Sequence, residues 1–184
     1  MRARRAALDT LAAVAERDAY ANLVLPGLLR SRGLSGMEAA RATDLAYGTL
    51  RGLGTYDRII DVCATRGLGS IDQPVLDALR MGTYQLLPRH TPAHAAVSTT
   101  VDLVRQRSGA GASRFANAVL RQVAERDLDG WVDAVVGPAG DERERLALRH
   151  LHPRWIVDVL AASLASDAAV DVAGDVDRLA AVLA

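Results

Sequence analysis

The chain has 184 residues, half of them apolar, and its 22 basic residues balance its 22 acidic ones. This length suits one domain of ordinary size with an appendage. No apolar run approaches the roughly 20 residues that span a bilayer. Alanine and leucine dominate while β-branched runs are scarce, which favours helices. The single Cys63 excludes an internal disulfide or a thiolate cluster for a metal, and we expect it to be a buried structural thiol.

Charge is unevenly distributed along the chain. Residues 1–130 carry 17 arginines against 13 acidic residues (+4), whereas residues 131–184 carry 5 against 9 (−4). Lysine is absent, so every basic side chain is a guanidinium, the group suited to bidentate phosphate contact. The basic start, MRARRAALDT, leads into an amphipathic pattern that contains Asp9, which is not typical of a signal peptide. We therefore expect a cytoplasmic protein.

Two helices are expected at the start of the chain. Residues 2–18 place Leu8 and Leu11 in an apolar stripe with helical spacing. Residues 21–33 form a short apolar segment that ends at Gly33.

A longer helix is expected to follow. Ser35 and Glu38 have the spacing of a capping box, which predicts a helix start at this point. The pattern then continues to about residue 67. Three glycines inside it predict a break or a close contact with a neighbouring helix: Gly48, Gly52 and Gly54.

The next two expected helices carry proline in their first turn, where the missing N–H costs nothing. Pro74 occupies this place in residues 71–90, and Pro92 follows Thr91 as the expected cap of the second helix. That second helix is expected to end in the glycine-bearing loop SGAGAS. Ser113 is then expected to cap a separate last helix, SRFANAVLRQV.

This last helix has an apolar arc and a polar face. The apolar arc comprises Phe115, Ala116, Val119, Leu120 and Val123, and the polar face comprises Arg114, Asn117 and Arg121. Asparagine is a weak helix former, because its side chain competes for backbone hydrogen bonds. Asn117 is therefore expected to have a tertiary partner or a ligand.

The chain as a whole reads as an all-α protein. Residues 1–130 predict a bundle of six or seven short helices, without an alternating strand pattern or a repeat. Residues 131–184 contain a Gly/Pro-bearing linker, a charged helix, a helix opening at Pro153 and a last helix from about Val176. We expect this second part to be a separate helical subdomain or a lead-in to one.

The residues alone indicate no catalytic, cofactor-binding or metal-binding site. The glycine-rich stretches RGLGTYD and SGAGAS follow no expected strand and lack a Walker lysine, so they read as turns. His90 and His94 have an i, i+4 spacing, but a helix boundary is expected between them and no acidic third ligand lies nearby in sequence. His150 and His152 would point to opposite sides of an extended segment. What remains is a set of arginines on helices, which either form solvated faces or converge on phosphate groups.

Five segments, taken in order, resemble the NusB-like fold over residues 3–127: RARRAALDTLAAV, DLAYGTLRGLGTYDRII, LDALRMGTYQLL, PAHAAVSTTVDLVRQ and RFANAVLRQV. The last segment resembles the family signature FVNAVLR, with Phe115, Asn117, Leu120 and Arg121 at matching positions and Ala116 in place of valine. The resemblance implies an all-α NusB-like helical bundle of two packed three-helix units that binds RNA.

The segment HPRWIVDVLAASL resembles the part that follows the NusB-like domain in the RsmB/Sun/Fmu type of ribosomal RNA cytosine-5 methyltransferase. This resemblance implies that residues 1–130 are the RNA-binding, substrate-positioning N-terminal domain of an S-adenosylmethionine-dependent enzyme acting on small-subunit ribosomal RNA. Residues 131–184 would be a linker and helical lead-in to an absent catalytic domain. The two catalytic cysteines of that domain have no counterpart here. This chain alone is therefore not expected to be an enzyme or to bind S-adenosylmethionine.

The same resemblance places the RNA-binding residues in two regions. The basic start of the first helix contributes Arg2, Arg4 and Arg5, and the signature helix contributes Arg114, Phe115, Asn117 and Arg121. Phe115 is either a stacking platform for a base or a core residue, and its place on the apolar arc favours the core.

Partners implied by the resemblance are ribosomal RNA, the chain's own C-terminal catalytic domain and a small-subunit ribosomal protein, with no membrane. Two alternatives stay open. The first is a stand-alone NusB-type transcription antitermination factor, for which the residues after 130 are surplus. The second is a protein–protein docking module, which the near-zero net charge favours.

Overall fold

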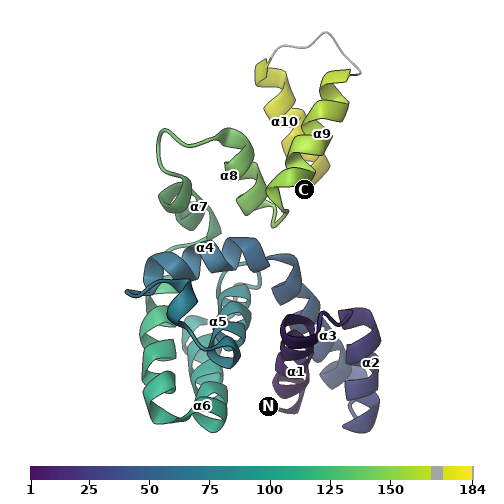
Figure 1. Ribbon diagram of the computed structural model, residues 1–184, viewed down its shortest axis with the longest axis vertical. Helices are drawn as coiled ribbons and strands as arrows, with labels where there is room; N and C mark the ends of the chain where they lie inside the picture. The colour runs from purple at the N-terminus through teal and green to yellow at the C-terminus, as the bar shows by residue number, and fades with distance from the viewer. Residues whose placement is uncertain (167–171, 184) are drawn as a thin grey trace. The chain divides into compact units, whose positions relative to one another are not determined.

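The computed structural model describes residues 1–166 and 172–183 (Figure 1). The chain divides into two compact units, residues 1–125 and residues 126–184. Every regular element among the described residues is a helix, which confirms the expected all-α fold with a helical extension. Within this described part, no helix is both long and apolar enough to cross a membrane.

The first unit is a bundle around one central helix, α5. Its helices are α1 (Arg2–Arg17), α2 (Ala21–Ser31), α3 (Gly36–Arg51), α4 (Leu53–Cys63), α5 (Gln73–Leu86) and α6 (Ala93–Val123), with a 3-10 turn at Leu68–Ser70. Helix α5 packs against α1, α3, α4 and α6. Every residue of α5 from Val75 to Leu86 is buried except Arg80. A helix that is buried on all sides is the expected centre of such a core.

Two glycines allow tyrosine rings to lie against the α3–α4 corner. A methyl group on Gly48 would lie 2.0 Å from Cζ of Tyr84, and one on Gly52 would lie 2.3 Å from Cζ of Tyr56. Gly52 is also the point where α3 ends and α4 begins. The glycines therefore provide both features that the sequence left open, a helix break and a close contact.

Helix α3 starts at the expected point, but the capping box that predicted this start does not form. Ser35 is the N-cap residue, but its side chain makes no capping hydrogen bond. Glu38 instead lies 3.5 Å from Nη1 of Arg2, in an ion pair between two exposed side chains. The distant arginine thus replaces the local backbone N–H as the partner of this carboxylate.

The expected division of this helical stretch within SGAGAS is confirmed, but the break lies at Gly109 and not at Ser113. Helical structure runs from Ala93 to Val123 and is broken only at Gly109, whose φ of 84° and ψ of −176° lie outside the helical region. Ser113 is buried beyond this break, and its Oγ donates to the carbonyl oxygen of Ala110 at 3.0 Å. Only Gly109 needs a positive φ, whereas the alanines beside it are good helix formers.

The second unit contains α7 (Leu128–Val136), α8 (Glu142–Arg149), α9 (Arg154–Ser166) and α10 (Val172–Leu183). Helix α9 begins directly after Pro153, as expected, and α10 begins four residues before the expected Val176. The core is formed by residues of α8, α9 and α10: Leu146, Ala147, Val157, Ala161, Leu179 and Leu183. This unit therefore has a small apolar core of its own.

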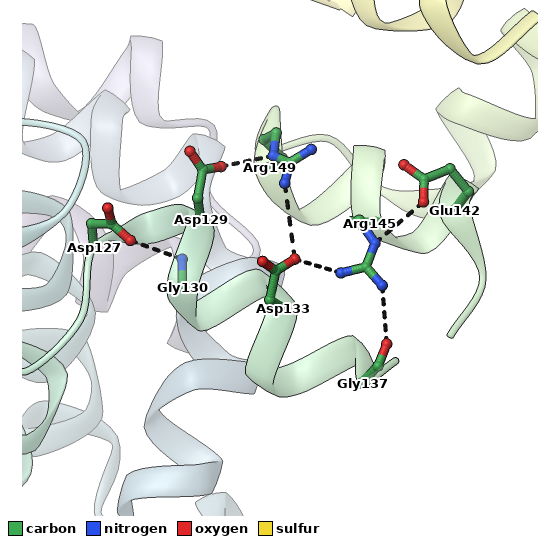
Figure 2. A network of polar contacts seen from close by, with 8 residues as sticks. All are labelled: Asp127, Asp129, Gly130, Asp133, Gly137, Glu142, Arg145 and Arg149. Carbon is green, nitrogen blue, oxygen red and sulfur yellow. Dashed lines mark hydrogen bonds and ion pairs between the residues drawn. The ribbon is translucent and has the colours of Figure 1, made fainter. Parts of the chain in front are cut away.

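Ion pairs hold α7 and α8 of this unit together (Figure 2). Arg145 lies 2.5 Å from Asp133 and 3.2 Å from Glu142, and its Nη2 donates to the carbonyl oxygen of Gly137 at 3.0 Å. Arg149 lies 2.7 Å from Asp129. Both guanidinium groups are thus surrounded by acceptors from their own unit.

Candidate nucleic-acid interface

The start of α1 forms one wall of a hollow of about 530 Å3 in the first unit. Its other walls come from the residue after α2 and from α6. Four arginines line it together with three other side chains: Arg2, Arg5, Arg32, Arg107, Asp9, Leu103 and Gln106. Three separate stretches of sequence therefore bring guanidinium groups to one place.

Asp9 organises this hollow. One of its carboxylate oxygens pairs with Nη2 of Arg32 and the other with Nη2 of Arg107. A single negative charge thus holds two guanidinium groups in place. Arg5 has no such partner here, because its Nη2 donates to the neutral amide oxygen of Gln106 at 2.6 Å.

The hollow carries excess positive charge, because four guanidinium groups face one carboxylate within it. Arg2 donates to the carbonyl oxygen of Arg32, and its side chain, which is 59% exposed, pairs with Glu38 at 3.5 Å. Such an exposed pair contributes little, because water and salt screen it. The hollow is therefore suited to bind phosphate oxygens, for which guanidinium groups are strong charge-assisted donors.

Arg4 does not belong to this surface, in contrast to the prediction from sequence. It is only 6% exposed, and its Nη2 donates to Oε1 of the buried Gln85 at 3.0 Å. Arg4 precedes Leu8 and Leu11 by four and seven residues, so it shares the inward stripe of α1 with them. Of the three predicted arginines in α1, only Arg2 and Arg5 line this hollow.

The predicted residues of the signature helix lie outside this hollow. Arg114 and Arg121 are exposed, and Asn117 is half-buried with no side-chain hydrogen bond to any other described residue. They follow the break at Gly109, whereas Gln106 and Arg107 precede it. The structure does not gather them with the start of α1 in one cavity.

Phe115 lines a separate hollow, of about 560 Å3. Its half-buried side chain lines this hollow with Ile71 and Val75, while Arg66 and Ser108 contribute polar groups. An aromatic ring beside a guanidinium is compatible with base stacking, and its partial burial is also compatible with core packing. Both interpretations of Phe115 therefore stay open.

The family model of the NusB family matches residues 1–125 of the chain. The chain belongs to the NusB family. The family resemblance inferred from the sequence segments is therefore confirmed, and we call residues 1–125 the NusB unit.

Three curated relatives extend the match beyond the NusB unit. A Mycobacterium tuberculosis protein that carries the name of a methyltransferase is 49% identical over 163 residues, which cover 88% of this chain and 36% of that protein. Proteins of Pseudomonas putida and Pseudomonas syringae pv. tomato, both named ribosomal RNA small subunit methyltransferase B, are 34% and 32% identical over 167 and 168 residues. These two alignments cover 88% and 89% of this chain but 35% and 34% of the relatives. The chain thus spans about a third of their length.

Two arginines of the interface in the NusB unit were missed by the sequence analysis. Arg32 and Arg107 are 23 and 98 residues away from Asp9, the carboxylate that they share. Neither belongs to a motif, and only the packing of α1, α2 and α6 brings them to Asp9. Local sequence pattern carries no signal for such a contact.

Cys63 ends α4 and is only 7% exposed, as expected for a structural thiol of the NusB unit. Among the residues that the structure describes, no group of three or more histidine, cysteine, aspartate or glutamate side chains is placed to hold a metal ion. Within that described part of the chain, the hollow around Asp9 is lined by no serine, cysteine or histidine.

Proposed function

We propose that this chain is the RNA-binding, substrate-positioning N-terminal part of an S-adenosylmethionine-dependent methyltransferase that modifies cytosine C5 in small-subunit ribosomal RNA. One observation carries the proposal. Alignments with relatives named ribosomal RNA small subunit methyltransferase B run through 88% of the chain, well past the end of the NusB unit at residue 125. Both units of the chain are therefore shared with proteins of that name.

The same observation weighs against a stand-alone antitermination factor, because such a factor needs only the NusB unit. It also weighs against a docking module without RNA. The near-zero net charge of the whole chain favoured that module, but the structure divides the charges unequally. Four arginines line the hollow around Asp9, which is a local excess of positive charge that the net value conceals.

In this proposal the hollow around Asp9 holds backbone phosphates of ribosomal RNA. Contacts to phosphate position a nucleic acid without reading its sequence. Arg2 and Arg5 supply exposed guanidinium groups, while Arg32 and Arg107 are held by Asp9 at the back of the site. Target selection would then rest with RNA shape and with the part of the protein that meets the base.

The described residues do not fit S-adenosylmethionine or the cytosine nucleophile. They form helices alone, whereas the expected cofactor domain is Rossmann-like and built on strands. Cys63 is buried in the bundle core and is not placed to attack a base. We propose that residues 131–184 lead into a catalytic domain outside this chain, which binds the cofactor, and that the whole protein acts in the cytoplasm, with a small-subunit ribosomal protein as a further partner.

A comparison of RNA substrates tests this function. The 184-residue chain is titrated with naked small-subunit ribosomal RNA and, separately, with a transcript leader of matched length. We expect tighter binding to the ribosomal RNA, and an affinity that falls as salt rises. Preference for the leader would support an antitermination factor instead. Absence of binding to both RNAs at low salt would remove RNA from the function of this chain.

A further inference from the structure

A second basic hollow lies in the NusB unit and shares no lining residue with the hollow around Asp9. Its volume is about 640 Å3, and its walls come from α1, α3 and the end of α5. The charged and amide side chains that line it are Arg4, Arg41, Arg89, Glu38, Asp44 and Gln85. The family resemblance implied RNA binding for Arg4 alone among these residues, and the proposed function gives this hollow no role.

Arg4 is the unusual member of this second hollow, because it is a buried cation without a carboxylate partner. Its Nη2 donates to Oε1 of Gln85 at 3.0 Å, and its buried Nε has no hydrogen-bond partner among the described residues. Gln85 is itself held, because its Nε2 donates to the carbonyl oxygen of Met81 at 3.1 Å. A neutral amide oxygen does not cancel a guanidinium charge, and arginine keeps its proton in proteins.

The acidic groups at this hollow are already engaged by other residues. Asp44 accepts from the hydroxyl of Tyr84 at 2.8 Å and lies 3.3 Å from Nε of Arg89. Glu38 is paired with Arg2. Arg41 is exposed and forms no ion pair with any residue that the structure describes. Two of the three guanidinium groups, Arg4 and Arg41, therefore lack a counter-charge.

The surroundings of Arg4 oppose its positive charge. Burial lowers the pKa of its guanidinium, and the charge of Arg41 lowers it further. Burying a cation without a paired anion is costly. An anion that entered the hollow would remove both unfavourable effects, because it would lie between the two uncompensated guanidinium groups.

We propose that this second hollow binds a phosphate group, with the buried Arg4 as its inner donor and Arg41 and Arg89 at its rim. Three guanidinium groups together carry more N–H donors than the two oxygens of one carboxylate can accept. A phosphate group, by contrast, presents up to four acceptor oxygens. The volume of about 640 Å3 also leaves room for the remainder of a nucleotide beside the phosphate. The phosphate comes either from a nucleic-acid backbone or from a free phosphate compound.

Titration with inorganic phosphate tests the proposal. The titration is followed by 31P NMR at constant ionic strength in the 184-residue chain carrying Arg5→Gln and Arg107→Gln, so that the hollow around Asp9 contributes little. We expect saturable binding, weakened about tenfold by adding Arg41→Gln, because one charge-assisted donor is lost. Adding Arg105→Gln, at an exposed arginine of α6 that lines neither basic hollow, is the matched control and is expected to change nothing.

Three results would overturn the proposal: no saturable binding, binding unchanged by Arg41→Gln, or equal weakening by Arg105→Gln. Arg4→Gln should abolish binding, but Arg41→Gln decides the matter because this exposed side chain is not needed for folding. An RNA oligonucleotide that displaces inorganic phosphate would identify the source as a nucleic-acid backbone, and failure to displace it would identify a free phosphate compound. An acidic peptide that binds where phosphate does not would replace the proposal by a protein site. None of these results depends on the hollow around Asp9.

Discussion

The arginines of the second unit and those of the hollow around Asp9 have opposite surroundings. In residues 126–184, Arg145 faces two carboxylates and a carbonyl oxygen, and Arg154 faces Asp141 at 2.6 Å, Asp158 at 3.0 Å and Glu144 at 3.7 Å. In the NusB unit, two arginines share the single Asp9, and Arg5 meets only a neutral amide. The number of nearby carboxylates, and not the number of arginines, therefore decides which surface can attract an anion.

The largest effect is expected where the carboxylate partner of an arginine is buried. Arg80 makes a bidentate contact to Asp57, at 2.6 and 2.7 Å, and a third contact to the buried Asp77 at 3.1 Å. Arg80→Ala leaves a buried carboxylate uncompensated, so we expect the NusB unit to lose about 3 kcal/mol of unfolding free energy. Equilibrium denaturation measures this loss.

Arg145→Ala is the matched control for Arg80→Ala. Its partners Asp133 and Glu142 are 63% and 48% exposed, so the loss of these pairs should cost less than about 1 kcal/mol. Equal losses for the two variants would show that burial does not separate the two kinds of arginine pair.

A smaller loss is expected from filling the contact between Gly48 and Tyr84. Gly48→Ala places a methyl group 2.0 Å from Cζ of Tyr84, and overpacking of this kind costs about 2 kcal/mol. Gly54→Ala is the control, because a methyl group there meets nothing within 4 Å. Denaturation should show a lower midpoint for Gly48→Ala alone, and only in the transition of the NusB unit. A lower midpoint for both variants would assign the loss to α3–α4 flexibility and not to the ring contact.

A weaker effect, on stability at high pH, is expected from Tyr84, whose hydroxyl donates to Asp44, the carboxylate that also pairs with Arg89. Burial, with the hydrogen bond and charge of Asp44, raises the pKa of Tyr84 from 10.0 to about 12. The folded state therefore holds the phenol proton more tightly than the unfolded state. Stability from this group is complete below about pH 10 and is lost as the pH rises towards about 12.

Tyr84→Phe should flatten the stability profile in this pH range, as followed by denaturation at a series of pH values. Tyr20→Phe is the control, since Tyr20 is 74% exposed. An unchanged profile in Tyr84→Phe would assign the alkaline loss to another group.

Much of the fold was predictable because its signals are local. Apolar stripes indicated the helices, Pro74 and Pro153 marked helix starts, and Gly48 and Gly52 indicated a corner. The errors arose where a local signal had a stronger competitor. Glu38 pairs with Arg2 instead of a backbone N–H, and the break within SGAGAS lies at Gly109, four residues before the expected Ser113.

The candidate site was predictable only in part. Arg2 and Arg5 were identified from the basic start of the chain, but Arg4 shares the stripe of Leu8 and Leu11 and could have been placed inside from its spacing alone. Arg32 and Arg107 reach Asp9 through contacts between helices distant in sequence. Helix periodicity shows on which face of its helix a residue lies, but it does not show which other helix that face contacts.

The salt dependence of RNA binding tests the central claim most directly. It is measured for the 184-residue chain, for Arg2→Gln with Arg5→Gln, and for the matched pair Arg145→Gln with Arg149→Gln. If the hollow around Asp9 contacts two phosphates through the first pair, log K against log salt should become shallower by about 1.4, because each contact to single-stranded RNA contributes about 0.7. The second pair, already engaged by carboxylates, should leave the slope unchanged. Equal slopes for all three proteins, or a shallower slope only in the second pair, would contradict the assignment of RNA binding to the NusB unit.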